Sequence, residues 1–176
     1  MKRLLPGLLL AVVFLYADKY NDTLLSIQAK VFPGILMMDT DLEQKLSNGA
    51  VSILLLHAPS DEFSAKQFRH AILNHYPDGI GTYPLIVQTG SEIPVGTPPT
   101  ALIVMQLEPA LLEEAIRYAI EQRRLLFAYD NSDLSKGAMV SLYLGKRTAP
   151  YLNPQTIKEA NIVFKPVLLS ISRLLR

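Results

Sequence analysis

The stretch AVSILLLHAPSD, Ala50–Asp61, decides the fold class of this chain of 176 residues. Residues 50–56 form an apolar run of strand length, and such a run without alternation is typical of a strand covered on both faces. His57, Ala58 and Pro59 follow, and Ser60 with Asp61 provides a capping signal for a helix. A buried strand that leads into a helix predicts an α/β fold with parallel strand pairing.

Strands and helices alternate on both sides of this stretch. Apolar side chains at helical spacing predict a helix over 22–38, which Pro33 and Gly34 interrupt, and a second helix over 61–75. A third helix begins at Pro109 and ends near Arg124. The buried stripe expected for the second helix consists of Phe63, Phe68, Ala71 and Ile72. Strands are expected over 84–88, 101–106 and 125–129, with a loop rich in glycine and proline over 89–100.

The last forty residues predict an antiparallel ending to the sheet. Residues 138–144 and 148–152 would pair as a hairpin across Gly145 and Lys146. Asn153 would cap a helix with Pro154 at its first position, and a closing helix is expected over 165–175. The predicted fold is therefore α/β, with a mixed sheet of about six strands flanked by helices, a C-terminal β-hairpin and a closing helix.

The first seventeen residues have the layout of a signal peptide. Lys2 and Arg3 precede an apolar run over 4–17, which is too short to cross about 30 Å of hydrocarbon as a helix. We expect cleavage after Ala17 and a single domain over 18–176, soluble and without direct membrane insertion. An uncleaved anchor and a buried first helix are the alternatives.

The remaining composition restricts the partners. Without residues 1–17 the chain has 15 basic and 16 acidic residues, a net charge of −1. This balance gives no electrostatic reason to expect nucleic acid or an anionic membrane as a partner. Cysteine is absent, so neither disulfides nor thiol chemistry contribute.

The sequence offers no pairing of residues for catalysis or for a metal. It has three histidines, and His70 and His75 are five residues apart on one helix, about 140° around its axis, so they cannot easily share an ion. No G-x-S-x-G elbow is present for a serine nucleophile. We therefore expect a protein that is not an enzyme and uses no cofactor and no metal.

Polar side chains follow four of the predicted strands. Ligands in open α/β sheets gather beyond the carboxyl ends of the strands, where loops converge. A small hydrogen-bonding cleft is one interpretation, and the other is that polar residues simply begin where strands end. The candidate ligand-binding residues are His57, Gln88, Thr89, Ser91, Gln106, Asp130 and Asn131.

The C-terminal half resembles the YfiR/HmsC-like family of exported bacterial proteins. The residues that carry the resemblance are Gly137-Ala138-Met139-Val140, Tyr151-Leu152-Asn153, Ala160-Asn161-Ile162, and Pro166 with Leu168-Leu169. The family pattern has a second glycine at Ala138 and a glycine at Asn161, and its members often use cysteines, which this chain lacks. A similar ending occurs in the second lobe of some periplasmic solute-binding proteins.

The resemblance implies a periplasmic regulatory protein in cyclic di-GMP signalling. Such a protein would dock on the exported sensor domain of an inner-membrane signalling enzyme of the diguanylate cyclase class and restrain it, and by analogy with the family it would form a homodimer. Leu36, Met37 and Met38 are candidates for the partner-binding surface, since methionine-rich surfaces adapt to partners; core packing is their other interpretation. The alternative function is a small-solute-binding lobe that feeds a periplasmic sensor or an ABC-type transporter.

Overall fold

The computed structural model describes residues 19–176, so the predicted signal peptide lies outside the described residues. Within the described part, no helix is long and apolar enough to cross a membrane. Seven strands form one mixed sheet in the order β2-β1-β3-β4-β5-β6-β7. The strands are Val51–Leu56 (β1), Leu85–Gly90 (β2), Ala101–Val104 (β3), Leu125–Ala128 (β4), Val140–Leu144 (β5), Thr148–Leu152 (β6) and Arg173–Leu174 (β7).

Five α-helices and three short 3₁₀ helices accompany these strands within residues 19–176. The α-helices are Asp22–Leu36 (α1), Glu62–His75 (α2), Pro109–Glu121 (α3), Pro154–Glu159 (α4) and Pro166–Ile171 (α5), and the 3₁₀ helices are Leu42–Lys45 (η1), Pro59–Asp61 (η2) and Asn131–Lys136 (η3). The predicted α/β class, with hairpin and closing helix, is confirmed.

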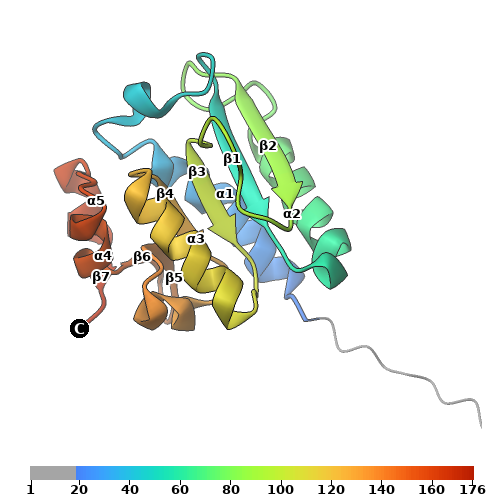
Figure 1. Ribbon diagram of the computed structural model, residues 1–176. Coiled ribbons are helices and arrows are strands. Elements are labelled where there is room, and N and C mark those ends of the chain that lie inside the picture. Colours follow the sequence, from blue (N-terminus) through green and yellow to red (C-terminus); the bar gives the residue numbers. More distant parts are fainter. Residues whose placement is uncertain (1–18) are drawn as a thin grey trace, which may run out of the picture.

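Helices cover the two faces of the sheet unequally. Figure 1 shows α1 and α2 behind the sheet and α3 in front of β3 and β4. The core forms between these layers; Phe32 of α1, for example, packs on Phe127 of β4 with ring centroids 4.8 Å apart. Strands β1 to β5 run parallel because helices or loops return the chain between them.

The connection from β2 to β3 lacks a helix. The loop over 91–100 crosses in front of β1 instead (Figure 1), and the outer face of β2 is consequently open: Ile86 is 46% exposed, while Val87 on the opposite face is buried. The sheet edge beside β2 is partly blocked, because Arg69 of α2 donates from Nε to the outward carbonyl of Val87 at 2.7 Å.

The last part of the chain extends the same sheet at the end away from β2. β5 and β6 pair as the predicted antiparallel hairpin, and Asn153 caps α4 as predicted, with Oδ1 accepting from Gln155 and Thr156 N–H groups. The predicted closing helix over 165–175 is too long: α5 ends at Ile171, and β7 then pairs with β6 as a seventh strand.

A short bridge joins this end to the body of the molecule. The Thr40 N–H donates to Val163 O at 2.9 Å and the Lys165 N–H donates to Met38 O at 2.8 Å. Asp39, between those two positions, is buried and forms an ion pair with Lys45, which is also buried. A buried pair of opposite charges therefore supports the junction.

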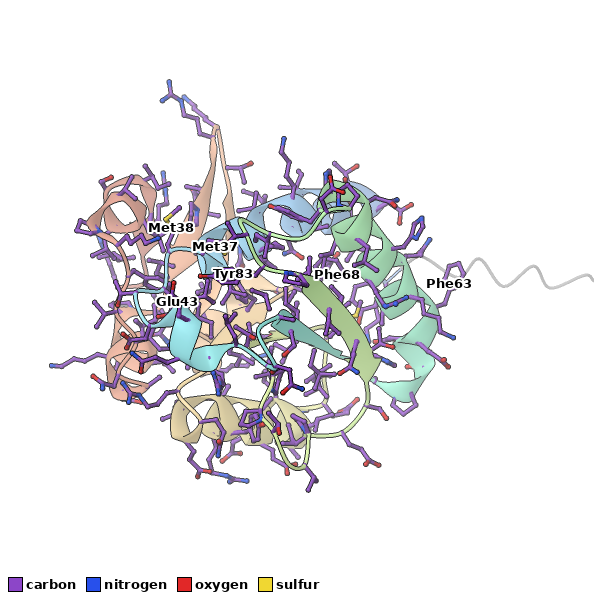
Figure 2. The ribbon with its side chains drawn as sticks, turned by 90° about the horizontal axis from the view of Figure 1, so that it is seen from above. Met37, Met38, Glu43, Phe63, Phe68 and Tyr83 are labelled. Carbon is purple, nitrogen blue, oxygen red and sulfur yellow. The ribbon has the colours of Figure 1, made fainter. Side chains whose placement is uncertain are left out.

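Two sequence-based details of the helices are wrong. Phe63 was expected in the buried stripe of α2 but is 73% exposed, whereas Phe68 is fully buried. Figure 2 shows Phe63 projecting away from the body and Phe68 pointing into it. The stripe consists of Ala65, Phe68 and Ile72 instead. The first helix continues through Pro33, because the residues around it pack in the core, and it ends at Leu36.

Candidate functional site

The carboxyl edge of the sheet at β1 and β3 is the position where the strand order reverses. The chain leaves β1 toward β2 on one side, and β3 lies on its other side. Such a switch point separates the loops that follow two neighbouring strands and is the usual ligand position in open α/β sheets. In this protein the loops are η2, with Asp61, and the segment after β3, with Gln106.

The side chain of Tyr20 fills this position. Its hydroxyl donates to Asp61 Oδ2 at 2.6 Å and accepts from the Gln106 N–H at 3.1 Å. Lys19 lies beside it, with Nζ 2.6 Å from Asp61 Oδ2 and 3.3 Å from Gln106 O. We call residues 19–21 the N-terminal arm; it contacts loops that are 40 to 90 residues away in sequence.

The electrostatics of the arm follow from its burial and its hydrogen bonds. Burial raises the pKa of the Tyr20 phenol, and the hydrogen bond to Asp61 raises that pKa further, so Tyr20 stays protonated and acts as a donor. Burial also acts to raise the pKa of Asp61, but hydrogen bonds from Lys19, Tyr20 and Ser60 outweigh it and hold the pKa below its usual value. The pair is therefore a carboxylate and a neutral phenol.

A second group of contacts secures the arm from α1 and β4. The rings of Tyr20 and Tyr129 meet edge to face with centroids 4.9 Å apart, and the Tyr129 hydroxyl accepts from the Asn21 N–H at 2.8 Å. Gln28 of α1 donates from Nε2 to Tyr129 O at 2.8 Å, while its Oε1 is buried without a hydrogen-bond partner. The Tyr20 side chain therefore has an aromatic ring on one side and polar groups at its hydroxyl end.

The predicted ligand-binding residues do not surround one cleft. His57 and Gln106 are near the arm: His57 is buried with Nδ1 2.8 Å from Ala58 O, and Gln106 bonds Tyr20 through its backbone. Gln88 is exposed and lines a pocket on the open face of β2. Thr89 is half-buried and Ser91 exposed near the end of β2.

Asp130 and Asn131 lie at the end of β4 in a different pocket. Asp130 accepts from the Ser132 N–H at 2.8 Å and so caps η3. Both residues line a small pocket of about 170 Å³ with Leu24 and Tyr129. The structure therefore places the seven residues in three separate groups, and ligand binding by them stays a prediction.

The predicted partner surface is only partly accessible. Leu36 is fully buried, so its placement on an exposed surface is wrong; it is the last residue of α1 and packs in the core. Met37 and Met38 are half-buried and pack against the core. Figure 2 shows both near the segment of η1 that carries Glu43.

The arm was the part of the site that sequence reasoning missed. Asp61 was noted only as a helix-capping residue, and neither Lys19 nor Tyr20 was among the candidate residues. Within residues 19–176 no cluster of three or more histidine or acidic side chains could hold a metal ion.

The chain matches no protein-family model and no curated protein. Two solved structures share its fold. A conserved domain protein from Vibrio cholerae O1 biovar El Tor aligns over 86% of this chain with 11% identity and a TM-score of 0.59. An ABC domain from Streptococcus pneumoniae, in complex with L-Trp, aligns over 80% of this chain with 8% identity and a TM-score of 0.51. This chain covers 60% and 62% of those two chains, about three fifths of each.

Proposed function

We propose that this protein is a binding module that recognises a small aromatic solute at the carboxyl edge between β1 and β3. The observation that carries the proposal is the arm itself: Tyr20 occupies the switch-point position as a ligand would, with its ring on Tyr129 and its hydroxyl between Asp61 and Gln106 N–H. The L-Trp complex of the pneumococcal domain with this fold supports the same class of ligand.

The groups around Tyr20 match an aromatic amino acid. The Asp61 carboxylate would accept from the ligand's ammonium group, and the Gln106 N–H would donate to its carboxylate. The ring would take the place of the Tyr20 ring against Tyr129. Because the arm occupies the same space, the ligand must displace Tyr20, and its apparent affinity is reduced by the fraction of molecules with the arm bound.

Calorimetry with L-Trp, L-Tyr and L-Phe tests this proposal. Tyr20→Ala should bind at least one of them about tenfold more tightly than the wild type, whereas Asp61→Asn should lose binding. Tyr83→Ala is the matched control, because the Tyr83 hydroxyl also donates to a carboxylate, that of Glu43 at 2.9 Å, but on the opposite edge of the sheet (Figure 2). Failure of all three amino acids to bind both the wild type and Tyr20→Ala would contradict the proposal.

A second candidate function is restraint of an inner-membrane signalling enzyme through its periplasmic sensor domain, as the YfiR/HmsC-like resemblance implies. The observation that favours it is the open face of β2. Ile86 is 46% exposed and Val95 in the following loop is fully exposed, and Ile86 and Pro94 line a pocket of about 320 Å³ on this face. An apolar face that no helix covers is suited to a protein partner.

This second function predicts a loss of partner capture when that face is charged. Ile86→Asp with Val95→Asp should abolish recovery of a membrane protein with a periplasmic sensor domain from solubilised membranes. Phe63→Asp changes another strongly exposed apolar residue, on a different face, and should leave recovery intact. Recovery of a permease instead would favour the solute-binding function in a transporter.

A further inference from the structure

We propose that the C-terminal end of the molecule docks on the surface of an anionic lipid membrane. This surface, which we call the basic end, comprises residues 144–176. It is the hairpin tip with β6, α4, α5 and β7, at the side of the sheet away from β2 (Figure 1).

Charge is divided sharply between this end and the rest. Residues 144–176 contain six basic residues and one acidic residue, a net charge of +5, while residues 19–143 contain nine basic and fourteen acidic residues, a net charge of −5. The near-neutral total therefore conceals a strongly polarised molecule. All six cations of the basic end are exposed: Lys146, Arg147, Lys158, Lys165, Arg173 and Arg176.

These cations are not neutralised by the protein. Within the described residues, none of the six forms an ion pair with a carboxylate; the five ion pairs found there all lie before residue 144. Arg173 lies over the ring of Tyr143 at 3.7 Å from its centroid instead. Their charge is thus available to an external anion.

The same end gathers the exposed apolar side chains. Of nine large apolar residues that are strongly exposed in the described chain, six belong to it: Leu144, Val163, Val167, Leu169, Ile171 and Leu174. Two adjoining pockets, which share Pro154 and Leu174, are lined by apolar residues and cations of this end. One contains Lys158, Val163 and Leu169, and the other Arg173 and Arg176.

Apolar side chains interleaved with unpaired cations match the chemistry of an anionic bilayer surface. Leucine, isoleucine and valine can enter the boundary between headgroups and acyl chains while lysine and arginine remain among the phosphates. A symmetric contact between two basic ends is disfavoured because it would bring two surfaces of charge +5 together. This is peripheral adsorption, which requires no spanning segment.

Vesicle sedimentation tests the proposal with residues 18–176, the chain expected after cleavage, which contain every element that the structure describes. Binding is expected to vesicles of phosphatidylcholine with 30% phosphatidylglycerol, to fall strongly between 50 and 500 mM salt, and to be weak for pure phosphatidylcholine. Replacing Lys146, Arg147, Lys158 and Arg176 by Gln should reduce binding by about fivefold per cation. Leu169→Ser with Ile171→Ser should also reduce it at unchanged charge.

The control variants change the same residue types outside the basic end. Lys30→Gln, Lys66→Gln, Arg117→Gln and Phe63→Ser should bind as the wild type does. Equal binding to both vesicle types, or unchanged binding of the four-Gln variant, overturns the proposal. So does light scattering that shows an oligomer which dissociates in the Leu169→Ser/Ile171→Ser variant, since the surface would then be an interface between copies. Capture of an acidic protein that these variants abolish, without vesicle binding by the wild type, overturns it as well.

Discussion

The carboxyl edge at β1 and β3 and the basic end differ in how they treat their polar groups. At the carboxyl edge, Lys19 and Tyr20 satisfy Asp61 and Gln106 from within the chain. At the basic end, six cations and six large apolar side chains are exposed. None of the six cations forms an ion pair with a carboxylate in the described residues. The first region is closed by its own sequence, whereas the second stays open within the described residues. The net charge of the whole chain does not show this difference between the two regions.

The largest effect on stability should come from the body of the molecule rather than from its outward-facing residues. Phe68→Ala removes a fully buried ring from α2 and should lower the free energy of unfolding by about 4 kcal/mol. Phe63→Ala, on the same helix, removes a ring that is mostly in water and should change it by less than about 0.5 kcal/mol. Urea unfolding of both variants measures the difference, and equal losses would contradict the assignment of the two faces of α2.

The junction between the two regions depends on a buried charge pair. Asp39→Ala leaves the Lys45 ammonium buried without its partner and should lower the free energy of unfolding by about 3 kcal/mol. Replacing both residues, Asp39→Leu with Lys45→Met, removes the uncompensated charge and should recover much of the loss. A double variant as unstable as Asp39→Ala, measured by urea unfolding, would show that the pair acts through the backbone contacts of Asp39 instead.

The stability that Asp61 contributes at the carboxyl edge of β1 and β3 should fall as the pH is lowered. Because the pKa of Asp61 is lowered in the folded state, its contribution is fully present above the ordinary pKa of about 3.8 and is lost as the pH falls through the lower folded-state value. Asp61→Asn should cost about 2 kcal/mol at pH 7 and should reduce this part of the acid sensitivity. Urea midpoints at pH 7 and pH 3 measure both effects; an unaltered pH dependence in Asp61→Asn would argue against the assigned contacts.

The smallest effect is expected at the basic end. Leu169 is 52% exposed on α5, so Leu169→Ser should shift the free energy of unfolding by less than about 0.5 kcal/mol. The same substitution, paired with Ile171→Ser, is expected to weaken vesicle binding. Thermal unfolding of the variant checks that the binding change is not a folding defect, and a large fall in melting temperature would mean that Leu169 packs on the fold.

The order and type of most elements could be predicted from the sequence because their signals are local. The apolar run at β1, Pro109 at the start of α3 and the Asn153 cap each act within a few residues. Phe63 was misplaced because five residues separate it from Phe68, about 140° around the helix axis, so it lies off the buried stripe of α2. The strand β7 was missed because Arg173 and Leu174 are too few residues to carry an alternating pattern.

The candidate site was less predictable than the fold. Polar residues after strands mark the carboxyl edge of the sheet. The sequence does not show that Asp130 caps a 3₁₀ helix or that His57 is buried, and neither is therefore free to bind a ligand. The arm could not be foreseen, since Tyr20 meets Asp61 and Gln106 only in the folded chain. Local geometry does explain two positions in the stretch that resembles the YfiR/HmsC-like family. Asn161 has φ of 52°, a left-handed conformation in which asparagine can replace glycine, whereas of residues 137 and 138 only Gly137, at 116°, requires it.

The hydrogen bond from Arg69 to Val87 O also bears on how copies of this protein behave at high concentration. β2 borders the sheet with main-chain groups turned outward, an arrangement that can template strand addition and fibril growth. A guanidinium seated on the middle carbonyl of that row occupies an acceptor that an incoming strand would need. Self-association by sheet extension is thereby obstructed at the edge strand β2 by one arginine side chain of α2.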